Sequence, residues 1–417
     1  MSNNESRPRM FLQCFKLIMF AVAAVCALAS VELSRAGEDS AKTKTGIDVL
    51  EEQNFAPLKG LRVGLITNQT GVDSKGRRTI DVLAAADGVR LVALFSPEHG
   101  IVGNLDQDVV DNAKDAATGL PIYSLYGASR RPRDQEVEGL DAFVFDIQDA
   151  GVRFYTYTST LGYGIEAAAK HHIPFFVLDR PNPLGGERIE GPVLDRDKIA
   201  FVAYFPMPIV YGMTLGELAQ MFNAENKIGA DLRVVKMKDW KRNEAYDDTG
   251  LRWIPPSPNL RTVAEVFPYP GIEILQAGGV SVGRGTDTPF ELVGAPWIRA
   301  DQLLAELTAR KIPGIEFRAA KFTPTSDAYG GVACEGVRLR VTDRSTFDSV
   351  RSGLEFAEAL HKLYPDHFQV AKMIVLVGSQ STIDRLERGD LVDRVIAGWS
   401  DDVAKFRDTR AKYLLYE

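Results

Sequence analysis

Short apolar runs alternate with longer amphipathic stretches over the first half of the chain. The runs lie at 62–67 (RVGLIT), 91–95 (LVALF), 142–147 (AFVFDI), 175–179 (FFVLD) and 232–236, and stretches with helical spacing lie between them at 79–86, 158–172 and 214–226. Strands that are apolar on both faces are buried on both faces, and helices between them make the strands parallel. The pattern therefore predicts a Rossmann-like, doubly wound parallel α/β sheet.

The pattern changes after residue 238. Prolines and glycines crowd residues 255–285, and helical spacing returns at 300–310 and 347–363, with an alternating strand at 336–341 (GVRLRV) and terminal helices up to residue 414. Such a change of texture is typical of a domain boundary. We predict a catalytic domain over 46–240 and a smaller C-terminal α+β domain over 241–417.

The N-terminus has the pattern of an export signal. Arg7, Arg9 and Lys16 precede an uncharged stretch at 17–29, which is too short for the roughly 20 residues of a spanning helix. We predict a signal peptide at 1–29, a flexible leader at 30–45, and a periplasmic or extracellular protein without stable membrane insertion. An uncleaved anchor and a lipid on Cys26 are the alternatives.

Composition and net charge limit the classes of protein to which the chain can belong. The chain has 417 residues, 45% hydrophobic and 25% charged, with a net charge of −7. This composition predicts packed globular domains, and the negative charge disfavours nucleic acid as a partner. Removal of the signal leaves Cys334 as the one cysteine, so no internal disulfide is expected, and we interpret Cys334 as a small buried residue.

Polar side chains follow four consecutive predicted strands. They are Asn68 after the first strand, Glu98 and His99 after the second, Asp146, Gln148 and Asp149 after the third, and Asp179, Arg180 and Asn182 after the fourth. In an open α/β sheet, ligands bind at the carboxyl ends of the strands. Any single group fits a turn or a helix cap, but together they predict a site at this edge.

The groups at this edge suit a polyhydroxylated substrate, because amides and carboxylates bond hydroxyls and rings cover sugar faces. Glycoside cleavage needs a carboxylic acid that protonates the leaving oxygen. Glu98 fits this role, since it lies on a short Pro-Glu-His-Gly loop directly after an apolar strand, where partial burial is expected. His99, as a general base or a hydrogen-bond partner, is the competing interpretation.

Other catalytic signatures are weak. The five histidines have no zinc-ligand spacing, and no dinucleotide or Walker motif follows the first strand, so we expect neither a metal nor a cofactor. Residues 279–283 match G-x-S-x-G, which makes Ser281 the candidate nucleophile of an alternative serine hydrolase. The sequence after it is a poor helix start, whereas a nucleophile elbow needs a strand, a turn and a helix.

Eight segments in order resemble one family. They are GLITNQTG (64–71), SPEHG (96–100), DIQDAGVRFYTY (146–157), LDRPNPLGG (178–186), YGMTLGEL (211–218), PPSPNL (255–260), GRGTDTPFELVGAPW (283–297) and CEGVRLRVTDR (334–344). The chain resembles the exo-β-N-acetylmuramidase family of peptidoglycan-recycling glycosidases. The resemblance implies a Rossmann-like catalytic domain, a smaller C-terminal domain, and a cleft between them that removes N-acetylmuramic acid from the non-reducing end of wall fragments. Glu98 stands in the SPEHG segment, at the position of the expected acid.

The resemblance also implies contacts for the sugar. The lactyl carboxylate of muramic acid needs a cation, for which Arg153, Arg180 and Arg284 are candidates. Tyr155, Tyr157 and Trp297 are candidate walls, and Asn259 is a further candidate for substrate contact. The default interpretation of these residues is a structural ion pair or a core ring.

Two questions stay open on the sequence. The second catalytic group is one of Asp146, Asp149 and Asp179, with activation of water, orientation of the acetamido group or participation by that group all open. A non-catalytic protein that binds wall sugars is the alternative of a different class, because it needs the same aromatic and arginine contacts without the acid.

Overall fold

The computed structural model describes residues 42–105, 107 and 109–417, so the predicted signal peptide and most of the predicted leader lie outside the described residues. The helices and strands of the first half are α2 (Gly46–Glu52), β1 (Arg62–Thr67), α3 (Thr79–Ala84), β2 (Arg90–Ser96), β3 (Ala113–Lys114), β4 (Pro121–Ser124), α4 (Asp134–Val137), β5 (Ala142–Asp146), α5 (Tyr157–Lys170), β6 (Phe175–Leu178), α6 (Leu215–Glu225) and β7 (Leu232–Val235). Those of the second half are α7 (Val263–Val266), α8 (Tyr269–Gln276), β8 (Leu292–Ala295), α9 (Ala300–Ala309), β9 (Ile315–Phe322), β10 (Cys334–Val341), α10 (Ser349–Leu363), α11 (Ile374–Val377), α12 (Gln380–Glu387), α13 (Val392–Ala397) and α14 (Ser400–Ala411).

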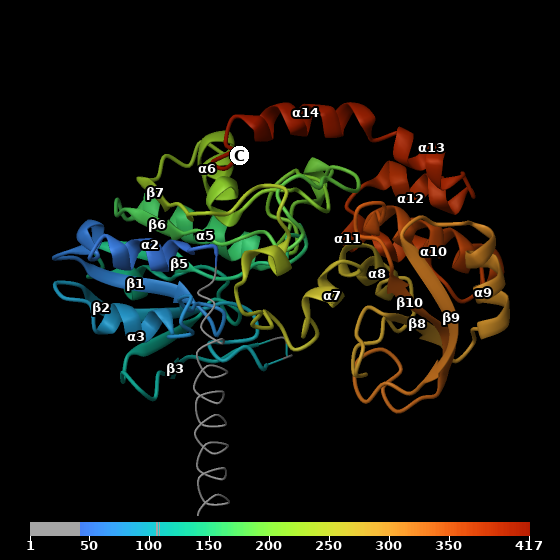
Figure 1. The fold of residues 1–417 in the computed structure, drawn as a ribbon, viewed down its shortest axis with the longest axis horizontal. Helices are drawn as coiled ribbons and strands as arrows, with labels where there is room; N and C mark the ends of the chain where they lie inside the picture. The colour runs from blue at the N-terminus through green and yellow to red at the C-terminus, as the bar shows by residue number, and fades with distance from the viewer. Residues whose placement is uncertain (1–41, 106, 108) are drawn as a thin grey trace, which may run out of the picture. The chain divides into compact units, whose positions relative to one another are not determined.

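The first half folds into a seven-stranded sheet in the order β3-β4-β2-β1-β5-β6-β7, shown with its helices in blue to green in Figure 1. All neighbouring strands are parallel except β3, which is antiparallel to β4. The predicted doubly wound parallel α/β fold is confirmed, and the short antiparallel β3 is an additional strand at its edge. Sequence patterning missed β3 because it has only two residues, both exposed.

Alternate residues of each strand enter different cores. On β1, Val63 and Leu65 pack in one buried cluster with α2 and α3, whereas Ile66 packs in a second cluster with α5 and α6. Burial of both faces is what makes these strands continuous apolar runs. The second cluster continues into the packing of the C-terminal half, so one core serves both sheets.

The second half contains a three-stranded antiparallel sheet in the order β8-β10-β9, in orange to red in Figure 1. The helix α10 packs against α8 and α9 beside this sheet. This agrees with the predicted smaller α+β part. The strand β9 was not predicted, because its outward residues are charged or small and only Ile315 of the strand is buried.

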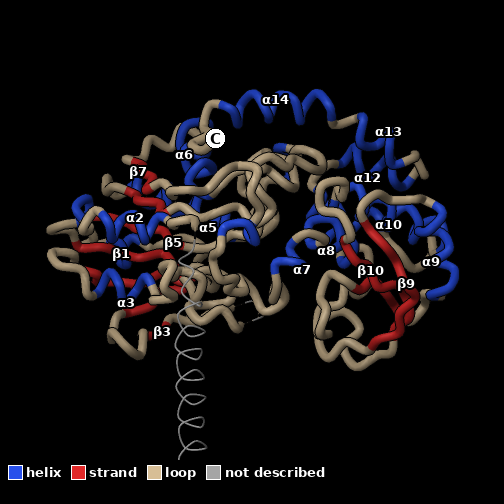
Figure 2. The backbone as a smooth tube through the Cα atoms, viewed as in Figure 1, coloured by secondary structure: helices blue, strands red, loops and turns tan. Residues whose placement is uncertain are grey.

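Long loops leave the carboxyl edge of the large sheet, as the tan segments of Figure 2 show. The connection between β6 and α6 runs from residue 179 to 214 with a single 3-10 turn at Arg196–Lys198, and another long connection follows β7. Loops at this edge are where an α/β enzyme places its chemistry.

Structure begins earlier than the sequence predicts. Thr43 donates its backbone N–H to the carbonyl of Thr249 at 3.1 Å, and Lys44 pairs with Lys238 in an isolated bridge. Both threonines Thr43 and Thr45 are buried. Residues 42–45 of the predicted flexible leader are therefore an ordered part of the fold, a correction whose cause is backbone pairing that composition does not reveal.

Residues 413–417 return to the large sheet. The Tyr416 hydroxyl donates to Asp179 Oδ2 at 2.6 Å, and the Leu415 N–H donates to Glu217 Oε1 at 2.7 Å. The Tyr416 ring also packs edge-on against Trp240. This C-terminal segment fills the surroundings of a buried carboxylate at the end of β6.

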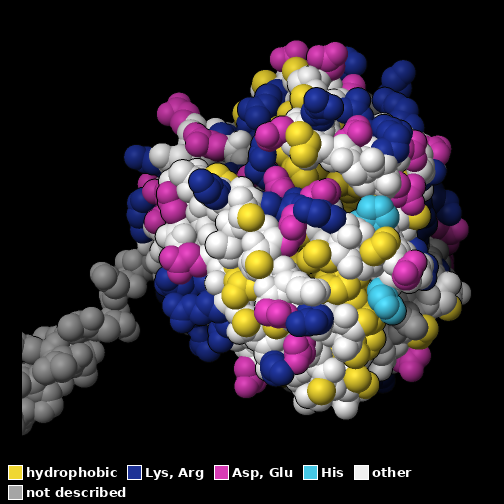
Figure 3. All heavy atoms as spheres, turned by 90° about the vertical axis from the view of Figure 1, so that its right-hand side faces the viewer, with side chains coloured by type: hydrophobic (Ala, Val, Ile, Leu, Met, Phe, Trp, Pro, Cys, Tyr) yellow, Lys and Arg dark blue, Asp and Glu magenta, His cyan; other side chains and the backbone are white. Residues whose placement is uncertain are grey.

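Side-chain charge is mixed on the face of the molecule that Figure 3 shows. The face in Figure 3 shows basic and acidic side chains interspersed, without a single-sign patch. None of the described helices is both long enough and apolar enough to cross a bilayer.

A fully buried arginine joins the two halves. Arg153 Nη1 donates to the carbonyls of Pro192 and Met207, at 3.0 and 2.8 Å, and Nη2 donates to those of Leu376 and Val377, both at 2.7 Å. The last two carbonyls belong to α11, a helix that ends at Gly378 in the left-handed conformation (φ 66°). A helix C-terminus favours a cation, which is why a lone guanidinium is accommodated here.

We expect Arg153→Met to lower the free energy of unfolding by about 3–5 kcal/mol, because four buried carbonyls lose their donors. Urea unfolding measures this. Arg233→Met is the matched control, since the Arg233 side chain is 50% exposed, and it should change stability by less than about 0.5 kcal/mol. Equal effects of the two variants would contradict the anchoring role.

Candidate active site

The site lies where the strand order reverses. The chain proceeds from β1 to β2 and β4 on one side, and then crosses to β5, β6 and β7 on the other. In doubly wound sheets the crevice at this switch point takes the ligand. Asn68 follows β1, Gln148 and Asp149 follow β5, and Glu98 follows the neighbouring β2.

Glu98 is half-buried and has a hydrogen-bond donor of its own. Its Oε2 accepts a bond from the Thr156 hydroxyl, at the start of α5. The two residues after it, His99 and Gly100, have φ values of 69° and 75°. A left-handed conformation is uncommon outside glycine, so this tight turn is a strained one that fixes the direction of the Glu98 side chain.

His99 holds the same loop. Its side chain is buried, and Nδ1 lies 2.7 Å from the carbonyl oxygen of Leu105. A protonated Nδ1 donates to this carbonyl, which fixes the imidazole. We interpret His99 as a partner that positions the Glu98 loop, in agreement with the second of its two predicted roles.

Asn68 and Tyr157 form a chain of hydrogen bonds beside Glu98. Asn68 Nδ2 donates to the Tyr157 hydroxyl at 2.8 Å, and that hydroxyl donates to the carbonyl of Pro256 at 2.6 Å. The hydroxyl also lies 3.5 Å from the backbone carbonyl oxygen of Glu98. Burial, reinforced by the charge of Glu98, raises the pKa of Tyr157 far above its usual value, so the phenol stays protonated.

Three tyrosine rings pack edge to face below this chain. The ring centroids of Tyr155 and Tyr157 are 4.8 Å apart, and those of Tyr155 and Tyr269 are 6.1 Å apart. Burial raises the pKa of Tyr155 and of Tyr269 well above 10, and the charges of Glu98 and Asp149 contribute to the shift of Tyr269. The carboxylates and the phenols therefore share one low-dielectric environment.

Asp149 is the buried carboxyl group of this environment. Its Oδ2 accepts bonds from the Tyr211 hydroxyl and, at 2.7 Å, from the backbone N–H of Gly151. Gly151 has φ 79°, and a Cβ there would lie 2.3 Å from Asn182 Oδ1, so this turn requires glycine. Burial raises the pKa of Asp149 to about 6, against the lowering effect of these hydrogen bonds.

Three buried polar atoms of this loop lack a partner among the described residues: Gln148 Oε1, Asp149 Oδ1 and the Tyr155 hydroxyl. Buried polar atoms in proteins are nearly always bonded, to protein or to another molecule. Unpaired atoms in one loop at the switch point identify this loop as a place for water or for polar groups of a ligand.

Several predicted site residues form buried hydrogen bonds and ion pairs with other groups of the protein. Asp146 and Arg180 form a buried ion pair, with Arg180 Nη2 2.9 Å from Asp146 Oδ2, and the Thr79 hydroxyl also donates to Asp146. Asp179 accepts from Thr214, Gly216 and Tyr416, and burial raises its pKa to about 6. These contacts give Asp146, Arg180 and Asp179 structural roles, and their catalytic and substrate-binding roles stay predictions.

Other residues predicted to contact the substrate are likewise bonded to groups of the protein. The Asn182 side-chain amide donates to the carbonyl of Met213, and its side-chain oxygen accepts a bond from the Leu184 N–H. Arg153 is fully buried on four carbonyls, and Arg284 pairs with Glu273 with 2.5 Å between Nη2 and Oε1. A guanidinium already held by protein acceptors has few donors left. The assignments of Asn182, Arg153 and Arg284 to substrate stay predictions.

The other candidates of the C-terminal half have surroundings of their own. Ser281 is buried and pairs with Gly294 in an isolated bridge, with no helix after it, so the nucleophile elbow is absent there. Trp297 stacks on His367 and donates to the Tyr329 hydroxyl. Cys334 is buried on β10, and burial raises the pKa of its thiol. Asn259 is buried beside the Pro256 loop and has a bonding partner.

Thr156, Tyr211, Tyr269 and Pro256 belong to the site without having been predicted. Thr156 stands in the segment DIQDAGVRFYTY, one residue from the predicted Tyr155 and Tyr157, so that motif was a usable signal. Tyr211 reaches Asp149 across 62 positions in sequence, and Pro256 reaches Tyr157 across 99. Contacts between loops so far apart in the chain produce no local sequence pattern from which they could be predicted.

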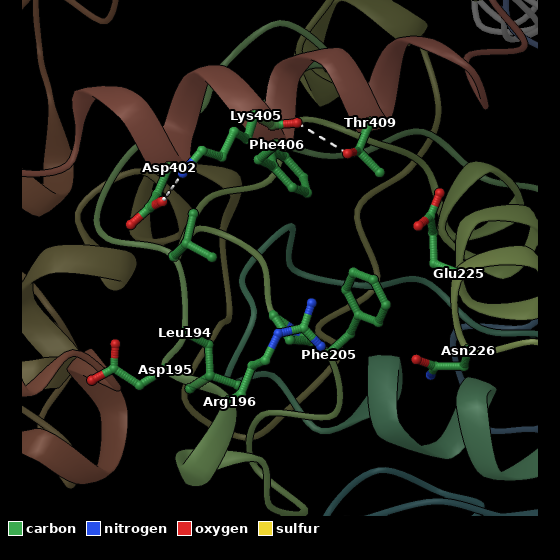
Figure 4. Close-up of a pocket in the computed structure, with 12 residues that line it drawn as sticks. Leu194, Asp195, Arg196, Phe205, Glu225, Asn226, Asp402, Lys405, Phe406 and Thr409 are labelled. Atoms are coloured by element: carbon green, nitrogen blue, oxygen red, sulfur yellow. Dashed lines mark hydrogen bonds and ion pairs between the residues drawn. The ribbon is translucent and has the colours of Figure 1, made fainter.

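Other clusters in the described residues lie elsewhere. The carboxylates of Asp48, Glu51 and Asp73 lie within 4.8 Å of one another, but Arg77 pairs with Glu51 and Asp73, which supplies the balancing charge. A cavity of about 390 Å³ lies beside α14, where Phe406, Phe205 and Arg196 are among the lining residues (Figure 4). None of the predicted site residues lines it.

A doubly wound sheet with a held carboxylic acid, amides and tyrosine rings at its switch point defines an α/β enzyme suited to a sugar substrate. Two family models match the chain: "Exo-beta-N-acetylmuramidase NamZ, N-terminal" over residues 63–264 and "Exo-beta-N-acetylmuramidase NamZ, C-terminal" over residues 267–416. The chain belongs to the NamZ family of exo-β-N-acetylmuramidases, which are glycoside hydrolases.

Individual relatives agree with this membership. The chain is 45% identical to the peptidoglycan β-N-acetylmuramidase NamZ of Bacillus subtilis (strain 168) over 379 residues, which cover 90% of this chain and 92% of the relative. A crystal structure of a DUF1343 family protein from Bacteroides fragilis has a TM-score of 0.84 and 40% identity, covering 90% of this chain and 99% of that one. A second such protein from the same organism has a TM-score of 0.73 and 30% identity, with the same coverage.

The raised pKa of Asp149 makes a prediction about stability. An acid whose pKa is about 6 in the folded protein and 3.8 when unfolded binds its proton more tightly in the folded state. Its contribution to stability is full below pH 3.8 and is lost as the pH rises through 6. Between pH 4.5 and 7.5 we expect the free energy of unfolding of the wild type to fall by about 2 kcal/mol more than that of Asp149→Asn, measured by urea unfolding. Parallel pH profiles of the two proteins would exclude a buried, titrating Asp149.

Proposed function

We propose that the protein removes β-linked N-acetylmuramic acid from the non-reducing end of peptidoglycan fragments, with Glu98 as the acid that protonates the leaving oxygen. The observation that carries this proposal is the position of Glu98. It is half-buried at the switch point of the sheet, held by Thr156 on a strained turn, beside a chain of tyrosine and amide groups. Family membership supplies the reaction class and the sugar.

The Thr156 contact orients the acid. A hydroxyl that donates to Oε2 leaves Oε1 as the oxygen that carries the proton toward the glycosidic oxygen. The strained His99–Gly100 turn limits the motion of the loop, so that the acid is placed before the substrate arrives.

Asp149 is the second acidic group of the proposed mechanism. Of the three aspartates that the sequence offers, Asp146 is paired with Arg180 and Asp179 is held by Tyr416 and Thr214. Asp149 alone among them has a carboxylate oxygen without a partner in the described residues. An unpaired, buried oxygen suits a group that accepts a proton from water or from the substrate's acetamido N–H.

The hydroxyl groups of Tyr155 and Tyr157, close to these acids, bind the sugar in this proposal. The phenols of Tyr155 and Tyr157 stay protonated because burial raises their pKa values. Tyr155 has a buried hydroxyl without a partner in the described residues, and Gln148 has a free Oε1. Together they offer bonds to sugar hydroxyls, with the rings as apolar walls.

We also propose export. The support is the basic and then apolar pattern of residues 1–29, followed by small residues at Ala27 and Ala29. Mass spectrometry of the protein recovered from a bacterial host's periplasm or medium tests this. A mature N-terminus after Ala29 or Ala36 is expected, and an intact Met1 on cytoplasmic protein would contradict it.

We expect Glu98→Gln to lower the rate of hydrolysis of a chromogenic β-N-acetylmuramide by about 10²–10⁴-fold, because the amide cannot donate the proton. Wild type should release the chromophore from this substrate and not from the N-acetylglucosamine analogue. The assay is steady-state absorbance at several pH values.

Glu138→Gln is the matched control, since Glu138 is exposed after α4 and has no part in the site. It should retain the wild-type rate. If Glu98→Gln also retains that rate, the acid lies elsewhere, and if wild type releases neither sugar, the hydrolytic assignment itself fails.

A further inference from the structure

An exposed arginine is stacked on two aromatic rings near Glu98. The Arg130 guanidinium carbon lies 4.0 Å from the ring centroid of Phe201 and 4.8 Å from that of Tyr126. Both rings are half-buried, and the arginine itself is exposed. We call Tyr126, Arg130 and Phe201 the arginine platform. A guanidinium that lies over aromatic rings is attracted by their faces, and its N–H groups can still donate hydrogen bonds.

The strand register places the platform beside the proposed acid. β2 and β4 are parallel neighbours in which Ser96 pairs with Ser124. Glu98 and Tyr126 each follow these serines by two residues, and the Leu125 N–H donates to the Ser96 carbonyl at 2.8 Å. Neighbouring strands are about 4.8 Å apart, so the two loops leave the sheet side by side.

The helix α5 gives a second link between the platform and Glu98. Thr156, just before this helix, donates to Glu98, and Ser159, three positions later, donates to the carbonyl of Phe201 at 2.5 Å. Residues three apart lie on the same face of a helix, about one turn from each other. Glu98 and Phe201 thus contact one face of α5.

A neighbouring arginine shows what is unusual about Arg130. Arg131 also lies over a ring, 3.7 Å from the centroid of Tyr163, but it forms an ion pair with Glu166. Over residues 42–105, 107 and 109–417, no carboxylate pairs with Arg130. Among the described residues, Glu166 neutralises Arg131, whereas Arg130 has no carboxylate partner.

The three arginines that the sequence offered for the lactyl carboxylate are already bonded to groups of the protein. Arg153 and Arg180 are buried on protein acceptors, and Arg284 is paired with Glu273. A lactyl carboxylate distinguishes N-acetylmuramic acid from N-acetylglucosamine, and a planar guanidinium bonds a carboxylate through two parallel N–H groups. We propose that Arg130, held by Tyr126 and Phe201, binds the lactyl carboxylate of the muramic acid unit. This inference rests on the proposed function and assigns its sugar specificity to one residue.

The test pairs a change in the protein with a change in the substrate. The substrates are a chromogenic β-N-acetylmuramide and its lactyl carboxamide, which is neutral and nearly isosteric. For wild type, kcat/KM should be roughly 10- to 100-fold higher on the carboxylate, as expected for a hydrogen-bonded charge. In Arg130→Ala this preference should disappear, mainly through KM, and Arg130→Lys should keep part of it.

Arg131→Ala is the matched control, because it removes the adjacent stacked arginine whose charge Glu166 already balances. It should keep the wild-type preference. A preference that persists in Arg130→Ala, or that is lost equally in Arg131→Ala, would overturn the proposal. Thermal unfolding of each variant checks that the fold is retained.

Binding separates this proposal from the catalytic one. Calorimetric titration with free N-acetylmuramic acid and with its lactyl carboxamide needs no hydrolysis. Wild type should bind the acid more tightly, by the same factor of about 10 to 100, and Arg130→Ala should bind the two alike. Wild type that hydrolyses neither substrate but shows this difference would retain Arg130 as the carboxylate site, whereas equal binding of both ligands by wild type would exclude it.

Discussion

The packing of the two halves depends on one buried guanidinium that, within the described residues, is bonded to carbonyl groups and to no carboxylate. Arg153 donates to carbonyls of two loops of the first half and of α11 in the second half. Burial lowers its pKa to about 9, so the group keeps its charge at neutral pH. Since the same loop carries Asp149, Tyr155 and Thr156, the anchor that joins the two halves also fixes the backbone of the candidate site.

That anchor explains how a site built on loops is kept rigid. Glu98, Asp149 and the tyrosines come from connections between strands and not from the strands themselves. Each loop is held by a buried polar contact, such as His99 to Leu105 O or Gln148 Nε2 to Pro181 O at 2.8 Å. Bonds of this kind gain strength in a low-dielectric interior, and they hold the side chains of the candidate site in place.

The strands of the large sheet were predictable because burial on both faces leaves continuous apolar runs such as 142–147. Strands with one exposed face and short edge strands, such as β9 and β3, leave weaker patterns and were missed. Topology predicted the carboxyl edge of the sheet as the place of the site, and the chemistry and loop of Glu98 together with the SPEHG segment predicted the acid; both stay predictions. The roles of single charges were not predictable, because Arg153 and Arg130 look equivalent in sequence. Their difference is burial, 0% exposure for Arg153 against an exposed Arg130, and burial is decided by loops far apart in the chain.

The return of residues 413–417 to the large sheet has a consequence for stability. Asp179 and Tyr416 are separated by 237 positions, so the ribosome delivers the buried carboxylate long before the phenol that binds it. Without this phenol, Asp179 keeps the donors of Thr214 and Gly216 but loses part of its coordination, and a buried carboxylate with fewer donors lowers stability. Full stability of the large sheet therefore depends on a residue that lies 237 positions away in the chain.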